Sequence, residues 1–234
     1  MTNQAINLIL LPGMDGTGKL FAPFIRALNQ NINTIVVSYP TDEVLNYVQL
    51  IKLASTYIPP NQPYFLLGES FSGPIAIALA ASADAHLKGL ILSCTFARNP
   101  RLQLSRLSFL VPAISIGHVL FSVMSKLLMA KFNNASIRQQ LFDAVSAVAP
   151  QVMRARLDAV IGVDYVEWLK KLDVPILYLR GKRDYLVPAS AGQLIMQQAK
   201  NAQLVELNTP HLLLQIAPND AAKSVQAFIE KTCQ

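Results

Sequence analysis

The sequence predicts an α/β fold: a mostly parallel six-stranded sheet with helices on both faces and an all-helical lid insertion. Short apolar runs alternate with longer amphipathic stretches, which is typical of parallel strands covered on both faces. The alternation stops between residues 97 and 171, where helix-like segments follow one another. A chain of 234 residues is long enough for one such domain with a buried core.

The strands are expected where short apolar runs are bounded by turn-forming residues. The first run is followed by a glycine-rich turn, and the third ends at Gly68. In chain order the predicted strands are Ile6 to Leu11, Thr34 to Ser38, Tyr64 to Leu67, Leu87 to Ser93, Ile176 to Arg180 and Leu204 to Leu207.

The segments between these strands carry apolar residues at helical spacing and predict helices. Pro74 is acceptable in the first turn of one of them, because the N–H that proline lacks would be unpaired there in any case. The predicted helices begin near Lys19 and near Asn219, or cover Val44 to Tyr57, about Ser72 to Ala83, and Ala189 to Ala199.

Residues 97–171 are predicted to form the helical lid, and residues 1–96 with 172–234 the core. Inserted helices are expected to cover the carboxyl ends of the strands, where open α/β sheets place their ligand sites. Within the lid, 19 uncharged residues separate Arg106 from Lys126, which is long enough to consider a membrane span. The polar residues within this stretch and the basic residues at both of its ends argue against a span. We expect no transmembrane segment and at most weak contact with a membrane surface.

The formal net charge of +6 is concentrated in the predicted lid. Six basic residues fall between positions 98 and 138, and no Asp or Glu lies between Asp84 and Asp143. Without these six, the remaining 14 Lys and Arg would balance the 14 Asp and Glu. The segment is apolar between its charges and lacks a known binding motif, so no nucleic-acid partner is expected.

The two cysteines, Cys94 and Cys233, form no CxxC pair, and Cys94 ends an apolar run. Cys94 is therefore predicted to be a small core residue. No metal cluster is recognisable, so neither a metal nor a cofactor is expected. The first residues lack the basic segment of a secretory signal, which predicts a cytoplasmic location.

An apolar strand runs directly into Gly68-Glu69-Ser70-Phe71-Ser72-Gly73 and then into a helix. Such a turn holds a serine in a strained backbone conformation with its hydroxyl pointing out of the sheet. The stretch resembles the nucleophile elbow of the α/β-hydrolase superfamily, with Ser70 as the nucleophile. The family pattern G-x-S-x-G has glycine at the fifth position, and we interpret Ser72 there as a tolerated small residue.

The superfamily order is serine, then acid, then histidine. Asp184 lies in the stretch Gly181 to Pro188 after the fifth predicted strand, which resembles the acid loop of the family. His211 follows the sixth predicted strand and resembles the base of the family. The resemblance implies that Ser70 is the nucleophile, that His211 moves its proton, and that Asp184 orients the imidazole.

An oxyanion hole needs backbone N–H groups that face the developing negative charge. The resemblance implies that Phe71, directly after the nucleophile, supplies one of them. The second is expected from Met14, in the loop after the first strand, where Pro12 replaces the usual histidine of the family.

Two other classes of function compete with a hydrolase. The stretch Gly13 to Leu20 nearly matches the phosphate-binding pattern G-x-x-x-x-G-K-[ST] of nucleotide-binding proteins. Leu20 stands where that pattern needs a magnesium ligand, which disfavours a nucleotide site. A non-catalytic ligand-binding protein on a hydrolase scaffold is the other alternative, because a fold does not determine a function.

A serine nucleophile favours the hydrolysis of a carboxylic ester, and thioesters use the same chemistry. The core and the three polar residues resemble small bacterial carboxylesterases, including the acyl-carrier-protein methyl ester esterases. The expected partner is a small-molecule ester with an apolar acyl part. It is expected to be carrier-linked or anionic if it is recognised by the basic rim of the lid, which consists of Arg98, Arg101, Arg106, Lys126, Lys131 and Arg138.

Overall fold

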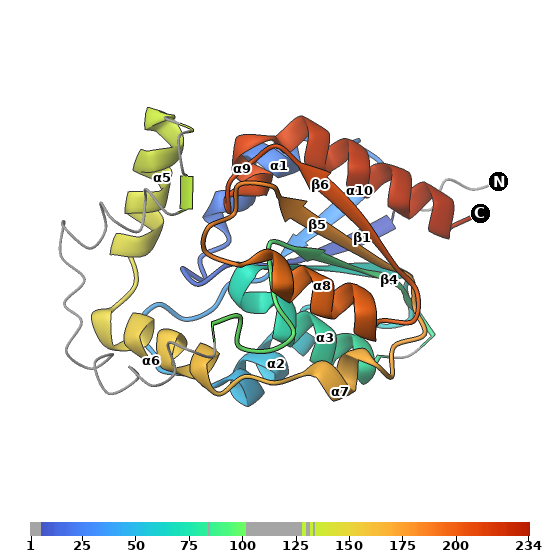
Figure 1. Ribbon diagram of the computed structural model, residues 1–234, viewed down its shortest axis with the longest axis horizontal. Coiled ribbons are helices and arrows are strands. Elements are labelled where there is room, and N and C mark those ends of the chain that lie inside the picture. The colour runs from blue at the N-terminus through green and yellow to red at the C-terminus, as the bar shows by residue number, and fades with distance from the viewer. Residues whose placement is uncertain (1–5, 84, 102–127, 130–131, 133) are drawn as a thin grey trace.

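The computed structural model describes residues 6–83, 85–101, 128–129, 132 and 134–234. Its centre is a six-stranded sheet in the order β2-β1-β3-β4-β5-β6, in which neighbouring strands run parallel (Figure 1). The strands are β1 (Ile6–Leu11), β2 (Ile32–Val36), β3 (Tyr64–Glu69), β4 (Leu87–Ser93), β5 (Ile176–Gly181) and β6 (Ala202–Leu207). The predicted fold class of a parallel sheet with helices on both faces is confirmed.

Both edge strands differ from their sequence-based boundaries by two residues, as does the end of β3. β2 begins and ends two residues before the predicted run, and β6 begins two residues before it. On β6 the side chains of Gln203 and Glu206 are exposed. An edge strand accepts polar residues because only part of its surface is covered, so an apolar run does not mark where it begins.

The helices cover both faces of the sheet (Figure 1). One face carries α1, α9 and α10, and the other carries α2, α3, α7 and α8. Their bounds are α1 (Ala22–Ala27), α2 (Tyr47–Ser55), α3 (Gly73–Ala81), α7 (Val166–Leu169), α8 (Ala189–Gln198), α9 (Leu213–Ile216) and α10 (Pro218–Thr232), with short 3-10 turns η1 (Lys19–Phe21) and η2 (Ser70–Ser72).

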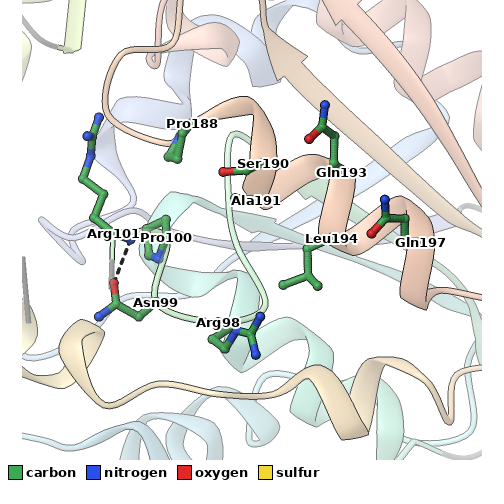
Figure 2. Close-up of a pocket in the computed structure, with 10 residues that line it drawn as sticks. All are labelled: Arg98, Asn99, Pro100, Arg101, Pro188, Ser190, Ala191, Gln193, Leu194 and Gln197. Carbon is green, nitrogen blue, oxygen red and sulfur yellow. Dashed lines mark hydrogen bonds between the residues drawn. The ribbon is translucent and has the colours of Figure 1, made fainter. Parts of the chain in front are cut away.

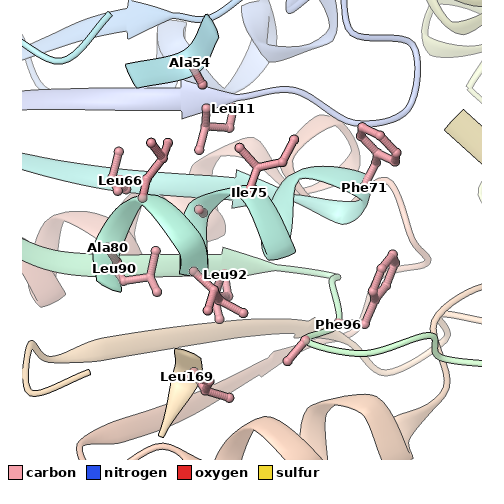
Figure 3. Close-up of a cluster of buried hydrophobic side chains, with 14 of the residues drawn as sticks. Leu11, Ala54, Leu66, Phe71, Ile75, Ala80, Leu90, Leu92, Phe96 and Leu169 are labelled. Carbon is pink, nitrogen blue, oxygen red and sulfur yellow. The ribbon is translucent and has the colours of Figure 1, made fainter. Parts of the chain in front are cut away.

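Alternate residues of the central strands build two separate hydrophobic cores. On β1, Ile9 and Leu11 join the core beneath α2 and α3, whereas Leu8 and Leu10 join the core beneath α1 and α10. Figure 3 shows the first of these cores, with side chains of the strands meeting those of α3. Both faces of these strands are largely apolar because both are covered, which explains why most of their residues are hydrophobic.

Part of the predicted lid lies within the described residues. It contains α5 (Ala135–Ser146) and α6 (Pro150–Ile161), which lie beyond the carboxyl ends of the strands (Figure 1), and also α7. Ile137 and Leu141 of α5 pack with Leu20 and Leu212. Val166 and Leu169 of α7 instead belong to the core beneath α3. The role of residues 97–171 as a lid stays a prediction.

The uncharged stretch between Arg106 and Lys126 lies outside the described residues, and so do these two residues. Among the helices that the structure describes, none is long and apolar enough to cross a membrane.

Candidate active site

Ser70 lies at the turn between β3 and α3, where its backbone adopts a φ of 50°. That left-handed conformation is uncommon for a residue with a side chain. The close approach of neighbouring segments explains the flanking glycines: a Cβ on Gly68 would lie 2.7 Å from the Cβ of Ala76, and one on Gly73 would lie 2.0 Å from Oγ1 of Thr95. The Thr95 hydroxyl donates to the Ser70 carbonyl, which fixes the turn from the side of β4.

The side chain of Ser72 forms two hydrogen bonds in addition to being small enough for a crowded position. Its buried hydroxyl donates to the carbonyl oxygen of Pro12 and lies 2.8 Å from the phenolic oxygen of Tyr39. Because the one hydroxyl hydrogen of Ser72 is used by Pro12, Tyr39 is the donor to Ser72. A glycine at the fifth position of the elbow could not make this connection, and the sequence-based interpretation of Ser72 was therefore incomplete.

Asp184 lies in the loop between β5 and α8, and its two carboxylate oxygens have different partners. Oδ1 accepts hydrogen bonds from the backbone N–H groups of Leu186 and Val187, each at 2.9 Å. Oδ2 lies 2.8 Å from Nδ1 of His211. Burial opposes the charge of Asp184, but His211 and the two backbone donors outweigh it and lower the pKa of the carboxyl.

His211 lies between β6 and α9 and joins the acid to the serine. Its Nε2 lies 2.8 Å from Oγ of Ser70, while its Nδ1 faces Asp184. Gly181 allows the two loops to meet, because a Cβ there would lie 2.4 Å from the Pro210 carbonyl oxygen. The structure thus brings together three residues that the sequence placed in separate loops, with His211 and Asp184 buried and Ser70 half-buried.

The two predicted oxyanion-hole residues follow neighbouring strands, Met14 after β1 and Phe71 after β3. Phe71 directly follows Ser70, and its carbonyl accepts from the Tyr47 hydroxyl at 3.1 Å while the two rings stack with centroids 4.9 Å apart. Met14 follows β1 in a turn closed by the Gly16 N–H, which donates to the Gly13 carbonyl at 3.0 Å. The Gly13 carbonyl and the Met14 N–H belong to the same trans peptide and point in opposite directions. The hydrogen bond to the Gly13 carbonyl therefore also sets the direction of the Met14 N–H.

A carboxyl group that the sequence did not single out lies directly beside the nucleophile. Glu69 is buried, and its Oε1 accepts from Nε2 of Gln215 at 3.0 Å. Burial raises the pKa of Glu69 to about 7, since the hydrogen bond from Gln215 only partly offsets the loss of water. The only local signal was the position of a charged residue at the end of an otherwise apolar strand.

In the loop that resembles a phosphate-binding pattern, the carboxylate of Asp15 accepts hydrogen bonds from donors of the same loop. Oδ2 of Asp15 accepts from the backbone N–H of Thr17 at 2.9 Å and from its hydroxyl at 2.6 Å. A phosphate bound to these donors would have to displace the Asp15 carboxylate and would be repelled by it. The geometry therefore disfavours the nucleotide-binding alternative.

Among the described residues, Cys94, Asp184 and His211 form one group of three potential metal ligands. Asp184 and His211 are already hydrogen-bonded to each other, so a metal ion would have to break the contact that orients the imidazole. Burial and the neighbouring Asp184 carboxylate raise the pKa of the Cys94 thiol, which disfavours the thiolate that metals bind. These donors fit a hydrogen-bonded site better than a metal centre.

A separate cavity of about 620 Å³ lies between the segment after β4 and helix α8 (Figure 2). Arg98 and Arg101 lie on one side of it, and Gln193 and Gln197 of α8 on the other. Arg101 also donates to the carbonyl oxygens of Tyr185 and Leu186 in the acid loop, through Nη2 and Nε. This arginine therefore supports the loop that carries Asp184.

The chain is similar in sequence to several known proteins. The family model of the serine aminopeptidase, S33, matches residues 40–209. The chain is 29% identical to the monoglyceride lipase of Rattus norvegicus over 188 residues, which are 76% of this chain and 54% of the relative. It is 28% identical to a pimeloyl-[acyl-carrier protein] methyl ester esterase of Neisseria meningitidis over 153 residues, 61% of this chain and 59% of the relative. The chain thus spans about half the length of the lipases it matches.

Solved structures share the fold at low sequence identity. A lipase-esterase related protein from Clostridium acetobutylicum superposes with a TM-score of 0.82 at 17% identity, covering 96% of this chain and 95% of the other. The enol-lactonase of Burkholderia xenovorans superposes with a TM-score of 0.80 at 18% identity, covering 97% and 92%. Since the family model matches well over half of its residues, the chain belongs to the serine aminopeptidase S33 family of α/β-hydrolases.

Proposed function

We propose that this protein is a serine hydrolase that cleaves a carboxylic ester through an acyl-enzyme. The observation that carries the proposal is a continuous hydrogen-bonded chain from Ser70 through His211 to Asp184, with both contacts at 2.8 Å. A serine hydroxyl is a weak nucleophile at neutral pH and needs a base within this distance.

In the proposed reaction, His211 accepts the Ser70 proton as Oγ attacks the ester carbonyl. His211 then returns the proton to the leaving alcohol, and a water molecule activated by the same imidazole releases the acyl group. Asp184 holds Nδ1 protonated, so that Nε2 is free to accept. Its lowered pKa supports this role, because the carboxylate stays charged and stabilises the imidazolium.

The oxyanion of each tetrahedral intermediate is proposed to bind the backbone N–H groups of Phe71 and Met14. The Phe71 N–H follows from its place directly after the nucleophile. The turn closed by Gly13 and Gly16 supports Met14 as the second donor, because it fixes the peptide that carries the Met14 N–H. Backbone donors held in this way stabilise developing charge without reorganising during the reaction.

The names of the relatives suggest the substrate class. One is called a monoglyceride lipase and another a pimeloyl-[acyl-carrier protein] methyl ester esterase, and both names describe ester cleavage. We propose an ester with an apolar acyl part, covered by residues 97–171 as a lid. The carrier-linked or anionic character of the substrate and the cytoplasmic location remain predictions.

A serine-reactive fluorophosphonate and a panel of p-nitrophenyl esters and acyl thioesters test the proposal. Ser70→Ala is expected to abolish labelling and to lower kcat by roughly 10⁴- to 10⁶-fold while the circular dichroism spectrum stays unchanged. Aminoacyl anilides in the same panel test for the peptidase activity that the family name describes, and EDTA tests for a metal. A wild-type protein that neither labels nor turns over any substrate would instead support the non-catalytic binding alternative.

A further inference from the structure

Arg156 of α6 is a buried arginine whose hydrogen bonds reach two loops at the carboxyl end of the sheet. Its Nη1 donates to the carbonyl oxygens of Met14 at 2.8 Å and Asp15 at 2.9 Å, and its Nη2 donates to that of Pro40 at 2.8 Å. Only 2% of the residue is exposed. A guanidinium so deeply buried is costly unless it is paired and hydrogen-bonded, which argues for a specific role of these contacts.

The surroundings of the guanidinium are shaped to admit it. The guanidinium carbon of Arg156, Cζ, lies 5.8 Å from the centre of the Tyr39 ring. Gly16 has a φ of 72°, and a Cβ there would lie 2.6 Å from Nη1 of Arg156. Glycine is therefore needed at position 16 both for its conformation and for the approach of the arginine.

Arg156 supplies part of a complete set of bonds along the loop after β1. The carbonyl of Pro12 accepts from Ser72, that of Gly13 from the Gly16 N–H, and that of Gly16 from the Tyr39 N–H at 2.8 Å. The two carbonyls between them, those of Met14 and Asp15, accept from Arg156. Five consecutive carbonyls are thus fixed, and two of the five depend on one side chain of α6.

We propose that Arg156 is a positioning residue for the oxyanion hole: by binding the Met14 and Asp15 carbonyls, it holds the loop so that the Met14 N–H faces the reacting carbonyl beside Ser70. The inference rests on the proposed serine hydrolase function. It couples α6, in the predicted lid, to the chemistry at the sheet edge. Displacement of α6 would then weaken stabilisation of the oxyanion without touching Ser70, His211 or Asp184.

The test compares Arg156→Lys and Arg156→Ala with Arg154→Ala, a matched change two residues away on the same helix. Lysine keeps the charge but cannot reproduce the planar fork of donors. Both Arg156 variants are expected to lower kcat by about 10- to 100-fold and to change KM by less than about threefold, because the lost interaction acts in the transition state.

The affinity for a trifluoromethyl ketone, which mimics the tetrahedral intermediate, should fall with kcat/KM. Millimolar guanidinium should restore part of the activity of Arg156→Ala and none to Arg154→Ala.

A structural role alone would give a different result. If Arg156→Lys loses thermal stability but keeps its kcat within about twofold at a temperature where it is folded, the inference is overturned. If Arg156→Ala does not fold, the lysine variant decides. The backbone amide resonance of ¹⁵N-labelled Met14 provides a readout that needs no turnover: it should shift in Arg156→Lys and not in Arg154→Ala. Failure of the proposed function would show in the wild type as absent Ser70-dependent turnover, whereas failure of this inference would show as an unchanged Met14 resonance.

Discussion

The phenolic hydroxyl of Tyr39 donates to the hydroxyl oxygen of Ser72 across 2.8 Å, and both groups are buried. The Ser72 hydroxyl in turn donates to the Pro12 carbonyl, at the start of the loop that carries Met14. The nucleophile elbow and the proposed oxyanion loop are therefore joined by side chains as well as by the sheet.

Ser72→Ala should lower the free energy of unfolding by about 1–3 kcal/mol, because it leaves the Pro12 carbonyl and the Tyr39 hydroxyl without a buried partner. It should also lower kcat by about tenfold, since small displacements of catalytic groups are costly. Urea denaturation and ester kinetics measure the two effects. Ser190→Ala, at an exposed serine of α8, is the control. Equal behaviour of the two variants would show that the Tyr39–Ser72–Pro12 connection has no energetic role.

Asp184→Asn should lower kcat by about 10⁴-fold while the protein stays folded. The Asn oxygen can replace Oδ1 as acceptor for the Leu186 and Val187 N–H groups, which leaves the amide NH₂ facing His211. That group donates to Nδ1 and forces the proton of the imidazole onto Nε2, where it can no longer accept from Ser70. Steady-state kinetics beside Asp173→Asn, an exposed control, measure the effect. Nearly unchanged kcat in Asp184→Asn would contradict the proposed role of the acid.

Gly181→Ala should lower both stability and kcat, because its Cβ would lie 2.4 Å from the Pro210 carbonyl and push the His211 loop away from Asp184. We expect a loss of about 1–3 kcal/mol in the free energy of unfolding. Gly162→Ala is the matched control, since nothing lies within 4 Å of a Cβ at that position. Thermal denaturation of both variants decides, and equal melting temperatures would contradict the expected clash.

Glu69→Gln should change how stability depends on pH. The pKa of Glu69 rises from 4.5 to about 7 on folding, so the folded state holds the proton more tightly than the unfolded state. The wild type therefore loses stability as pH rises from about 4.5 to about 7, and Glu69→Gln removes this loss. Between pH 5 and pH 8 the stability of the variant relative to wild type should increase by on the order of 2 kcal/mol. Urea denaturation at both pH values measures it, and Glu43→Gln, at an exposed glutamate, is the control.

Arg98→Glu tests whether the basic rim attracts an anionic or carrier-linked ester. We expect KM for such an ester to rise by about 3- to 10-fold, with little change for a neutral ester, and added salt should mimic the substitution. Arg101 is unsuitable for this purpose because it also supports the acid loop, and Arg106 lies outside the described residues. Lys88→Glu, at the opposite end of β4, carries the same charge change. Equal effects on charged and neutral esters would leave Arg98 as an ordinary surface residue.

The sequence by itself determined the fold and the three central residues of the site. Strands buried on both faces are marked by runs of apolar residues, such as Leu8 to Leu11 of β1 and Phe65 to Leu67 of β3. Ser70, Asp184 and His211 each follow a strand predicted from the sequence, and the carboxyl ends of parallel strands meet at one edge of the sheet. Position along the chain was therefore enough to predict that they would come together.

Only the tertiary structure decided which residues support that site. Arg156 contacts a carbonyl 142 positions earlier in the chain, and Ser72 contacts one 60 positions earlier. Local patterns could not show this, because an arginine on an amphipathic helix is normally exposed, and a serine in an elbow satisfies the need for a small residue whether or not its hydroxyl is bonded. Where distant segments of the chain meet, water cannot reach the buried carbonyls. The side chains of Arg156 and Ser72 must therefore donate the hydrogen bonds that these carbonyls need.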